Sequence, residues 1–339
     1  MKITIVEIAK KLGVHPSTVS LALRDSPKIP EKTREKVKKT AEEMGYRVNP
    51  YVSALMSARR QGKLPENPPT IAFVTSSDTP DGWKKMYNAN EFHSGCANVA
   101  QSLGMKLESF WIGEKNMSPA RLNEILYNRG IQGGIFLPTG HYREKMNHNW
   151  QHMAAVSYGI YDISPSMDRV KADHYGNMEK VIGTLIEQGF LRIGFAMDIP
   201  YPYQNHNRWL AAYLMHSRNL SARKKLLPFL DEEPTVANFK AWYEKQKPDV
   251  IICVHAENVS AWLTKLSIEV PTDVSLVTLG TAQEKQAFSG IIENSVTCGK
   301  LAMEMLLDRI HHNQFGPPES PRYVTVRGRW NPGTTLCAP

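Results

Sequence analysis

The sequence has few cysteines and no long apolar run. Its four cysteines, Cys96, Cys253, Cys298 and Cys337, are widely separated and include no Cys-x-x-Cys pair, so we expect reduced thiols instead of a disulfide framework. No apolar stretch approaches the roughly 18 residues that a membrane span needs. The N-terminus lacks the apolar core of a signal peptide. These absences predict a cytoplasmic protein that makes no membrane contact.

Sequence patterns for catalysis and for metal or cofactor binding are also missing. The eleven histidines form no His-Glu-x-x-His or similar metal-ligand spacing. The chain has no Gly-x-Ser-x-Gly elbow and no dinucleotide fingerprint. Cys298-Gly299-Lys300 is similar to the end of a phosphate loop, but Asn294 stands where that loop requires a glycine. We therefore expect no catalytic residue, no metal site and no cofactor.

The excess positive charge lies in one short part of the chain. The net charge is +8, from 41 Lys and Arg against 33 Asp and Glu. Residues 1–63 hold 14 of the basic and 6 of the acidic side chains, which leaves 27 of each sign in the remainder. A basic run on a helix is often only a solvated face. On a helical domain that contacts DNA, the same charge would neutralise backbone phosphates.

Residues 4–24 have the pattern of two short helices joined by a turn. Thr4 and Glu7 have the spacing of a capping box, and apolar residues then recur at helical spacing. Gly13 ends this helix, and Pro16 suits the first turn of a second helix. Such a pair is a helix-turn-helix, and the outward side of its second helix fits a DNA major groove.

A third helix, a hinge segment and a linker are predicted between residues 31 and 69. A third helix is expected over residues 31–44, ended by Gly45. Asn49 and Pro50 suit the start of a short helix of about two turns, which would need DNA or a second copy of the chain to persist. Residues 61–69 form a polar, proline-rich linker. We therefore divide the chain into a helix-turn-helix domain (1–48), a hinge and linker (49–69) and a larger domain (70–339).

After the linker, predicted strands alternate with predicted helices. Strands are expected at residues 71–74, 105–111, 133–137, 154–158, 192–197, 250–254 and 275–279. Helices are expected at residues 90–103, 119–128, 175–188, 208–217 and 259–266. Alternation on this scale predicts an α/β fold with parallel sheets covered by helices.

The N-terminal residues closely resemble the DNA-binding domain of the LacI/GalR family of transcription regulators. The resemblance rests on Val14-His15-Pro16-Ser17-Thr18-Val19-Ser20, on Thr33-Arg34-x-x-Val37 and on Gly45-Tyr46-x-x-Asn49. It implies that the segment from Asn49 to Ala58 is the family's hinge helix, which pairs with its dimer mate in the DNA minor groove. Val48 stands where the family usually has a proline, and the proline lies at Pro50 instead.

The larger domain resembles the effector domain of the same family, a two-lobed fold like that of a type I periplasmic sugar-binding protein. The matching segments are Ile125-Leu126-x-x-Arg129-Gly130-Ile131-Gln132-Gly133, Gln188-Gly189-Phe190-x-Arg192-Ile193-Gly194-Phe195, Pro248-Asp249-Val250-Ile251, Val270-Pro271-x-Asp273-Val274-Ser275 and Gly299-x-x-Ala302. In such a fold the chain crosses between the lobes three times, and we expect these crossings near Asp168, Gly290 and Pro321.

The resemblance implies which side chains contact DNA. Pro16, Ser17 and Leu21 occupy the positions that read bases, and Leu55 matches a leucine that wedges between base pairs. Two alternatives stay open, namely that Leu21 is a core residue and that Leu55 packs on the next domain. The predicted DNA-binding residues are Thr4, Pro16, Ser17, Thr18, Ser20, Leu21, Arg24, Asn49, Tyr51, Val52 and Leu55.

A small-molecule site is expected in the crevice beyond the carboxyl ends of the strands. Arg208 resembles the family's arginine that binds sugar hydroxyls, although it could instead be a surface residue of a helix. His255-Ala256 replaces the family's usual Asn-Asp, so the sugar-binding aspartate is absent unless Glu257 substitutes for it. The predicted effector-binding residues are Ser77, Asp78, His141, Tyr142, Tyr158, Asp173, Arg208, His255 and Glu293.

Together these features predict a homodimeric regulator, most often a repressor in this family, that binds a pseudo-palindromic operator in double-stranded DNA. Its localisation would be cytoplasmic, at the nucleoid. The effector is expected to be a sugar or sugar derivative, on resemblance alone. A ligand-dependent activator is the alternative within the same class. A transport-type solute-binding protein would share the two-lobed fold but not the helix-turn-helix.

Overall fold

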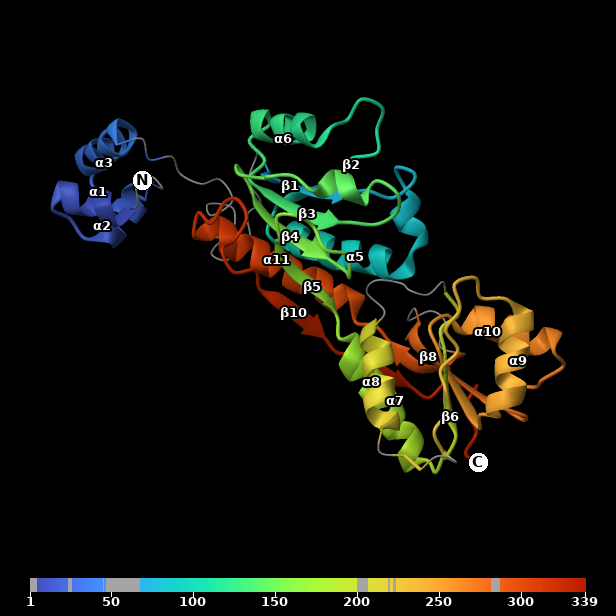
Figure 1. Ribbon diagram of the computed structural model, residues 1–339. Coiled ribbons are helices and arrows are strands. Elements are labelled where there is room, and N and C mark those ends of the chain that lie inside the picture. Colours follow the sequence, from blue (N-terminus) through green and yellow to red (C-terminus); the bar gives the residue numbers. More distant parts are fainter. Residues whose placement is uncertain are drawn as a thin grey trace. The chain divides into compact units, whose positions relative to one another are not determined.

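The computed structural model describes residues 5–23, 26–44, 46, 68–199, 207–218, 220–221, 224–281 and 287–339. The chain forms two units (Figure 1). One holds Met1–Pro69 with Leu103–Met105, and the other holds Thr70–Ser102 with Lys106–Pro339.

The N-terminal unit contains the three predicted helices. They are α1 (Ile5–Leu12), α2 (Pro16–Ala22) and α3 (Glu31–Glu43). Their inner faces meet in a small apolar core of Ile8, Ala9, Val19, Ala22, Val37 and Ala41. Each helix therefore supplies the core from one apolar face. Most of the Lys and Arg side chains of α3 stay exposed.

The second unit has two lobes, each built on one sheet. The first sheet is entirely parallel, with strand order β10-β5-β4-β3-β1-β2. Its strands are β1 (Thr70–Thr75), β2 (Lys106–Trp111), β3 (Gly133–Leu137), β4 (Ala154–Tyr158), β5 (Asp168–Ala172) and β10 (Tyr323–Val326). The last strand returns from far along the chain to pair with β5, so the first lobe is not a continuous segment.

The second sheet has strand order β11-β9-β8-β7-β6, and only the pairing of β11 with β9 is antiparallel. Its strands are β6 (Ile193–Ala196), β7 (Val250–Cys253), β8 (Ser275–Thr281), β9 (Ser289–Ile292) and β11 (Arg329–Asn331). Strands β6 and β7 are buried along their whole length, as expected for parallel strands covered on both faces.

Helices cover both faces of each sheet (Figure 1). In the first lobe α5 (Tyr87–Ser102) and α11 (Ser295–His311) pack closely together. α6 (Pro119–Asn128) contributes Leu122 and Leu126 to the apolar cluster on the other face of the sheet. In the second lobe α7 (His174–Glu187) and α8 (Asn207–Ser217) cover one face. The other face is covered by α9 (Val236–Gln246) and α10 (Ala256–Lys265). The predicted α/β fold with parallel sheets is confirmed.

The chain crosses between the lobes three times, a few residues later than predicted. The crossings lie between β5 and α7, between β9 and α11, and between β10 and β11. The predicted positions Asp168 and Gly290 are inside strands β5 and β9, and Pro321 precedes β10. Asp168-Arg-Val-Lys-Ala172 carries three charged residues in five, so its apolar pattern does not reveal a strand.

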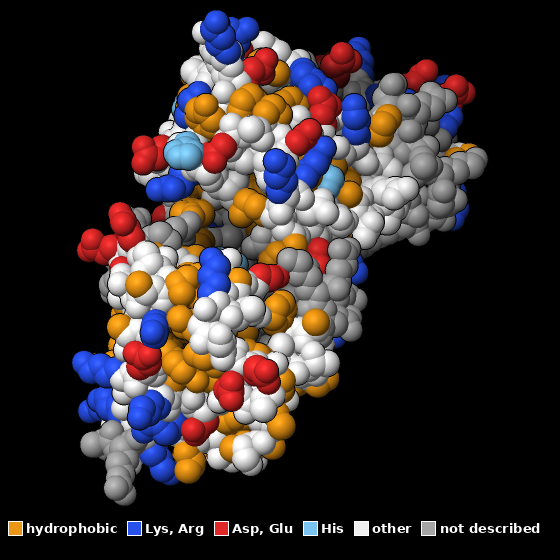
Figure 2. Space-filling model, turned by 90° about the vertical axis from the view of Figure 1, so that its right-hand side faces the viewer, with side chains coloured by type: hydrophobic (Ala, Val, Ile, Leu, Met, Phe, Trp, Pro, Cys, Tyr) orange, Lys and Arg blue, Asp and Glu red, His pale blue; other side chains and the backbone are white. Residues whose placement is uncertain are grey.

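Charges of both signs are distributed over the molecular face in Figure 2, where Lys and Arg side chains alternate with Asp and Glu. This agrees with the equal numbers of basic and acidic side chains after residue 63. Among the residues that the structure describes, there is no helix that combines the length and the hydropathy of a membrane span.

Candidate functional site

A cavity of about 430 Å³ lies between the two lobes of the second unit. The first lobe lines it with residues around Tyr87 and with the segments that follow β3 and β4. The second lobe contributes residues that follow β6 and β7, together with Gly280 of β8 and Trp209 of α8. The crossing segments supply Ala172, His174 and Glu293. The cavity therefore lies beyond the carboxyl ends of the strands, where ligands bind in open α/β sheets.

Glu293 is the buried acid of this cavity. It follows β9 directly, in the second crossing, and only 8% of its surface is exposed. Its Oε1 atom lies 3.8 Å from His174 Nε2, which is beyond hydrogen-bond distance. Burial, and in second place the nearby Glu91 carboxylate, raise the pKa of Glu293 to about 7. The carboxyl group thus changes its charge near neutral pH.

Two tyrosines place hydroxyl groups at the same cavity. The Tyr158 ring stacks on Phe92 with ring centroids 3.9 Å apart, and its hydroxyl lies 3.4 Å from Ser295 Oγ. Burial, followed by the charge of Glu293, raises the pKa of Tyr158 and of Tyr87 well above the ordinary value. Both hydroxyls are therefore protonated at neutral pH and can donate hydrogen bonds.

Gly280 keeps space open between these polar groups. A Cβ atom at this position would lie 3.0 Å from the Tyr87 hydroxyl oxygen and 3.4 Å from Glu293 Oε1. The hydroxyl and the carboxylate thus lie close to one wall of the cavity. A larger side chain at Gly280 would displace one of them.

His255 enters the cavity from the second lobe and is oriented by a buried carboxylate. Asp198, which follows β6, accepts hydrogen bonds from the backbone N–H groups of Val254 and His255 at 3.1 and 2.9 Å. Its second oxygen lies 3.0 Å from His255 Nδ1 and accepts from Asn258 at 2.9 Å. Hydrogen bonding to Asp198 raises the pKa of His255. The contact leaves Nε2 as the ring nitrogen that is not bound to Asp198.

The three crossing segments are joined through the residues next to Glu293. Asn294 donates a hydrogen bond to the Arg327 carbonyl oxygen at 2.6 Å. The Arg327 side chain lies 3.4 Å from Asp173, whose backbone N–H donates to Val326 at 2.9 Å. A ligand that contacts Glu293 would therefore contact the segments about which the lobes can move.

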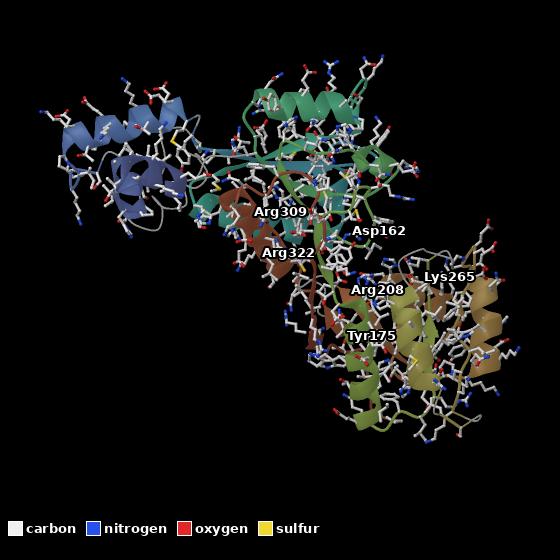
Figure 3. All side chains as sticks on the ribbon, turned by 60° about the vertical axis from the view of Figure 1, so that its left-hand side comes forward. Asp162, Tyr175, Arg208, Lys265, Arg309 and Arg322 are labelled. Carbon is white, nitrogen blue, oxygen red and sulfur yellow. The ribbon has the colours of Figure 1, made fainter. Side chains whose placement is uncertain are left out.

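The predicted effector-binding residues fall into three places. Tyr158, His255 and Glu293 line the cavity. Ser77, Asp78, His141 and Tyr142 lie after β1 and β3 but outside the lining, where His141 Nδ1 contacts Asp78 Oδ1 at 2.6 Å. Asp173 is the N-cap of α7 and accepts from the Gly176 N–H at 3.1 Å. Arg208 is exposed at the start of α8, outside the lining (Figure 3).

Arg208 instead lies near a buried lysine. Lys171 on β5 is 5% exposed, and its ammonium and the Arg169 guanidinium each lie 5.3 Å from the centroid of the Tyr323 ring. Burial, and after it the positive charges of Arg208 and Arg169, lower the pKa of Lys171 to about 8. The side chains of Arg208 and Lys171 therefore interact repulsively.

Sequence reasoning missed several cavity residues, chiefly Tyr87, His174 and Trp209. Asp198, which orients His255, was missed as well, although it follows a predicted strand just as Asp78 does. The position of Asp198 after β6 was therefore a usable signal. Tyr87 is the first residue of α5, just after a short 3-10 helix (Gly82–Lys85), and its approach to the cavity depends on packing between lobes.

The N-terminal unit presents part of its predicted DNA-binding surface. In α2, His15 Nδ1 accepts from the Ser17 N–H at 3.3 Å and lies 2.8 Å from Ser17 Oγ. Leu21 is half-buried and is not part of the apolar cluster of this unit, whereas Leu23 packs against it. Pro16, Thr18 and Ser20 are also half-buried. Thr4, Arg24, Asn49, Tyr51, Val52 and Leu55 lie outside the described residues.

Within the described part of the chain, no group of three or more His, Cys, Asp or Glu side chains is arranged to hold a metal ion.

Two protein-family models match the chain. Residues 4–49 match the model of bacterial regulatory proteins of the lacI family. Residues 182–333 match a periplasmic binding protein-like domain. The first match covers the helix-turn-helix, and the second covers most of the second lobe together with α11 and β10 of the first lobe.

Similar proteins include HTH-type transcriptional regulators. The HTH-type transcriptional regulator MalR of Streptococcus pneumoniae serotype 4 is 23% identical over 331 residues, which cover 93% of this chain and 94% of MalR. The HTH-type transcriptional regulator GntR of Pseudomonas aeruginosa is 43% identical over 56 residues, 16% of each chain. Identity is thus higher over the short match than along the full length.

Solved structures share the fold at low sequence identity. The lac repressor dimer bound to operator and the anti-inducer ONPF has a TM-score of 0.57 and 15% identity, over 99% of this chain and 100% of that chain. The complex of the transcriptional regulator CelR with cellobiose has a TM-score of 0.58 and 17% identity, with the same coverage.

Proposed function

We propose that this chain, a member of the lacI family of bacterial regulatory proteins, represses transcription until a small molecule binds between its lobes. One observation carries the proposal. The chain joins a helix-turn-helix to a two-lobed domain whose cavity is bounded by the crossing segments. The same cavity can therefore bind a ligand and sense the relative position of the lobes.

On the DNA side, α2 would enter the major groove with Pro16, Ser17, Thr18, Ser20 and Leu21. Ser17 is exposed and its hydroxyl is oriented by His15, so it suits a contact to a base edge or a phosphate. The positive charge of residues 1–63 would supply the phosphate contacts. Asn49, Tyr51, Val52 and Leu55 are proposed to act in the minor groove. Thr4 and Arg24 are proposed to contact DNA as well.

A two-fold dimer on a pseudo-palindromic operator is the arrangement we propose, since isologous dimers match symmetric half-sites. The related lac repressor structure is described as a dimer bound to operator. Repression, rather than activation, is proposed on the same likeness.

On the ligand side, Glu293, Tyr87, Tyr158, His174 and His255 would bind the effector. The ligand can shift the lobes only through a difference in its affinity for the two states. Glu293 suits this role because its neighbour Asn294 is hydrogen-bonded to a second crossing segment. A contact made in one lobe arrangement and lost in the other would supply the difference in affinity.

The proposed effector is a carbohydrate. Similar structures are described with cellobiose (CelR) and with glucose (CcpA of Weissella paramesenteroides). The cavity combines hydroxyl and carboxylate acceptors with the aromatic rings of Tyr158 and Trp209, which suits the polar edge and the apolar face of a sugar.

The test has two parts. Fluorescence anisotropy with labelled duplexes from the flanks of the gene should reveal a specific fragment, whose affinity falls steeply with salt because counterions are released. A thermal-shift screen of mono- and disaccharides should find a compound that raises the melting temperature and alters DNA affinity. Failure of every fragment to bind specifically, with or without sugars, would refute the proposed function.

A further inference from the structure

We propose that the cavity takes a hydroxylated ligand that carries a protonated amine, with Glu293 as the counter-charge of that amine. This inference rests on the proposed function, in which the cavity is the effector site. It narrows the ligand class from carbohydrates in general to amino sugars, because an amino sugar carries both hydroxyl groups and an ammonium group.

The Glu293 carboxylate is buried without a hydrogen-bond donor among the described residues. It is nine-tenths buried and borders the cavity. Among the described residues none donates a hydrogen bond to it, and its nearest basic nitrogen, His174 Nε2, lies 3.8 Å away. A buried carboxylate without donors is costly, and an ammonium group of a ligand would supply both the charge and the hydrogen bonds.

Negative charge from several carboxylates surrounds the cavity. Glu91 and Glu257 lie close enough to raise the pKa of Tyr87 together with Glu293. Of the basic residues in the described lining, Lys85 is exposed, His255 has one ring nitrogen bound to Asp198, and His174 Nε2 lies 3.8 Å from Glu293 Oε1. The three carboxylates of Glu293, Glu91 and Glu257 act together on this end of the cavity, which disfavours sugar phosphates and sugar acids.

Aromatic side chains form part of the cavity lining. Tyr87, Tyr158 and Trp209 border the same cavity as Glu293. Aromatic rings attract ammonium groups through their negative faces, most strongly where water is excluded. A neutral sugar would use the rings and the hydroxyls but would leave the carboxylate without a counter-charge. A protonated amine would satisfy all three kinds of group.

The experiment compares matched ligands by calorimetry on the full-length protein at pH 7.5. Glucosamine, galactosamine and mannosamine are each measured against the parent hexose and the N-acetylated sugar. We expect at least one amine to bind about tenfold more tightly than both of its neutral partners, the gain of a charged over a neutral hydrogen bond. Equal or tighter binding of the neutral partner in all three sets would overturn the inference and leave the proposed carbohydrate effector in place.

The variant Glu293→Gln should reduce the preference for the amine to about onefold while neutral sugars still bind. The matched control is Glu179→Gln, which removes an equal charge from an exposed side chain of α7 outside the lining and should keep the preference. A preference that survives Glu293→Gln would overturn the role of Glu293.

A second measurement follows the protons released when the amine binds. At pH 7, Glu293 is partly protonated, so an ammonium ligand should release protons on binding, and the heat should vary with the ionisation enthalpy of the buffer. Among the described residues, the titratable groups that interact with Glu293 are His174, Tyr87, Tyr158, Glu91 and Cys298. If the released proton comes from Glu293, the proton release should disappear in the Glu293→Gln variant. No proton release with a bound amine would contradict the proposal, and binding by no sugar of any kind would count against the proposed carbohydrate effector as well.

Discussion

His255 Nδ1 lies 3.0 Å from a carboxylate oxygen of Asp198, and the same arrangement occurs in the first lobe between His141 and Asp78. Each aspartate follows the first strand of its lobe in the chain, β6 or β1, and each histidine follows the neighbouring strand, β7 or β3. In both pairs the aspartate also accepts from the histidine backbone N–H, at 2.9 and 2.8 Å. Both lobes therefore connect adjacent strand ends through an Asp–His pair.

The first prediction follows from the difference in burial between these pairs. The Asp198 side chain is fully buried, whereas that of Asp78 is 57% exposed. Asp198→Asn should lower the free energy of unfolding by roughly 1–3 kcal/mol, since a buried acceptor for several donors is lost. Asp78→Asn should leave it unchanged within error. Urea denaturation of both variants measures the difference, and equal effects would contradict the argument.

The same substitution has a predicted pH dependence. Hydrogen bonding to Asp198 raises the folded-state pKa of His255 above its ordinary value. The resulting stability is fully present below the ordinary pKa and is lost as pH rises through the folded-state value. The gap between wild type and Asp198→Asn should therefore be larger at pH 6 than at pH 8. A proton NMR titration should show the pKa of His255 falling in the variant.

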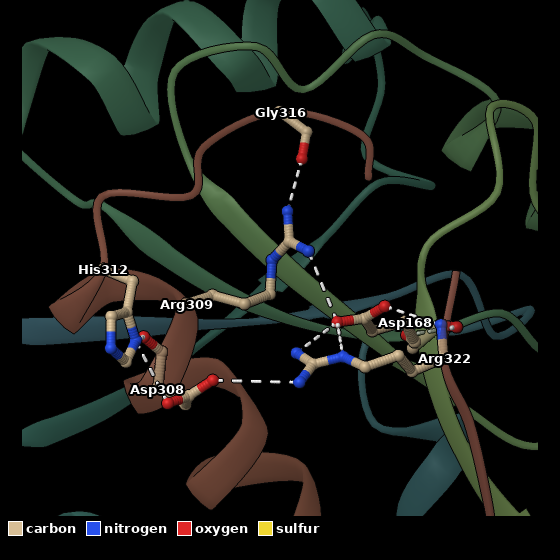
Figure 4. A network of polar contacts seen from close by, with 7 residues as sticks. Asp168, Asp308, Arg309, His312, Gly316 and Arg322 are labelled. Atoms are coloured by element: carbon tan, nitrogen blue, oxygen red, sulfur yellow. Dashed lines mark hydrogen bonds and ion pairs between the residues drawn. The ribbon is translucent and has the colours of Figure 1, made fainter. Parts of the chain in front are cut away.

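A second prediction concerns the buried Asp168 of the first lobe (Figure 4). Its carboxylate accepts from the Arg322 backbone N–H at 2.8 Å and from the Arg322 guanidinium at 2.8 and 3.1 Å, and it pairs with the buried Arg309 at 3.3 Å. Asp168→Ala should cost about 3–5 kcal/mol, because it leaves a buried guanidinium without its counter-charge.

The matched control for Asp168 is Asp308, which is 3.8 Å from the same Arg322 but 47% exposed. Asp308→Asn should change the free energy of unfolding by less than about 1 kcal/mol, as for surface ion pairs generally. Chemical denaturation of the two variants decides the point. A small effect of Asp168→Ala would mean that Arg309 reaches water in the variant.

The sequence predicted the strands and helices that carry continuous apolar patterns. β3 and β4 were predicted residue for residue, because runs such as Gly133–Leu137 are apolar and bounded by polar turns. β5 was missed because three of its five residues, Asp168, Arg169 and Lys171, are charged. They are buried together with partners distant in sequence, such as Arg309 and Tyr323. α9 and α11 were also not predicted.

The site was predictable where it depends on strand ends and not where it depends on packing between lobes. Tyr158, His255 and Glu293 were predicted by position and line the cavity. Arg208 was predicted from family likeness and lies outside the lining, beside Lys171. Whether Arg208 faces a ligand depends on the relative position of the lobes, which no local pattern encodes.

A third prediction uses Lys171, whose pKa is lowered from 10.5 to about 8 by burial and by Arg208 and Arg169. A depressed pKa means that the charged lysine destabilises the fold at pH 7, and that stability rises with pH between about 8 and 10.5. Lys171→Met should therefore raise the free energy of unfolding at pH 7, by up to about 3 kcal/mol. The gain should shrink as the pH is raised from 7 to 9. The exposed Lys180→Met is the control, and a destabilised Lys171→Met would contradict the prediction.

The fourth prediction separates the stability of the fold from its function at Glu293. Its pKa is raised from 4.5 to about 7, so the folded state disfavours the ionised carboxylate and loses stability as pH rises between these values. Glu293→Gln should thus raise the free energy of unfolding at pH 8 by about 3 kcal/mol, with a gap close to zero at pH 4.5. Thermal unfolding across this pH range measures the gap. A variant less stable than wild type at pH 8 would show that the carboxylate is already paired inside the fold, whereas a gain in stability with loss of ligand response fits a charge kept in the cavity for the ligand.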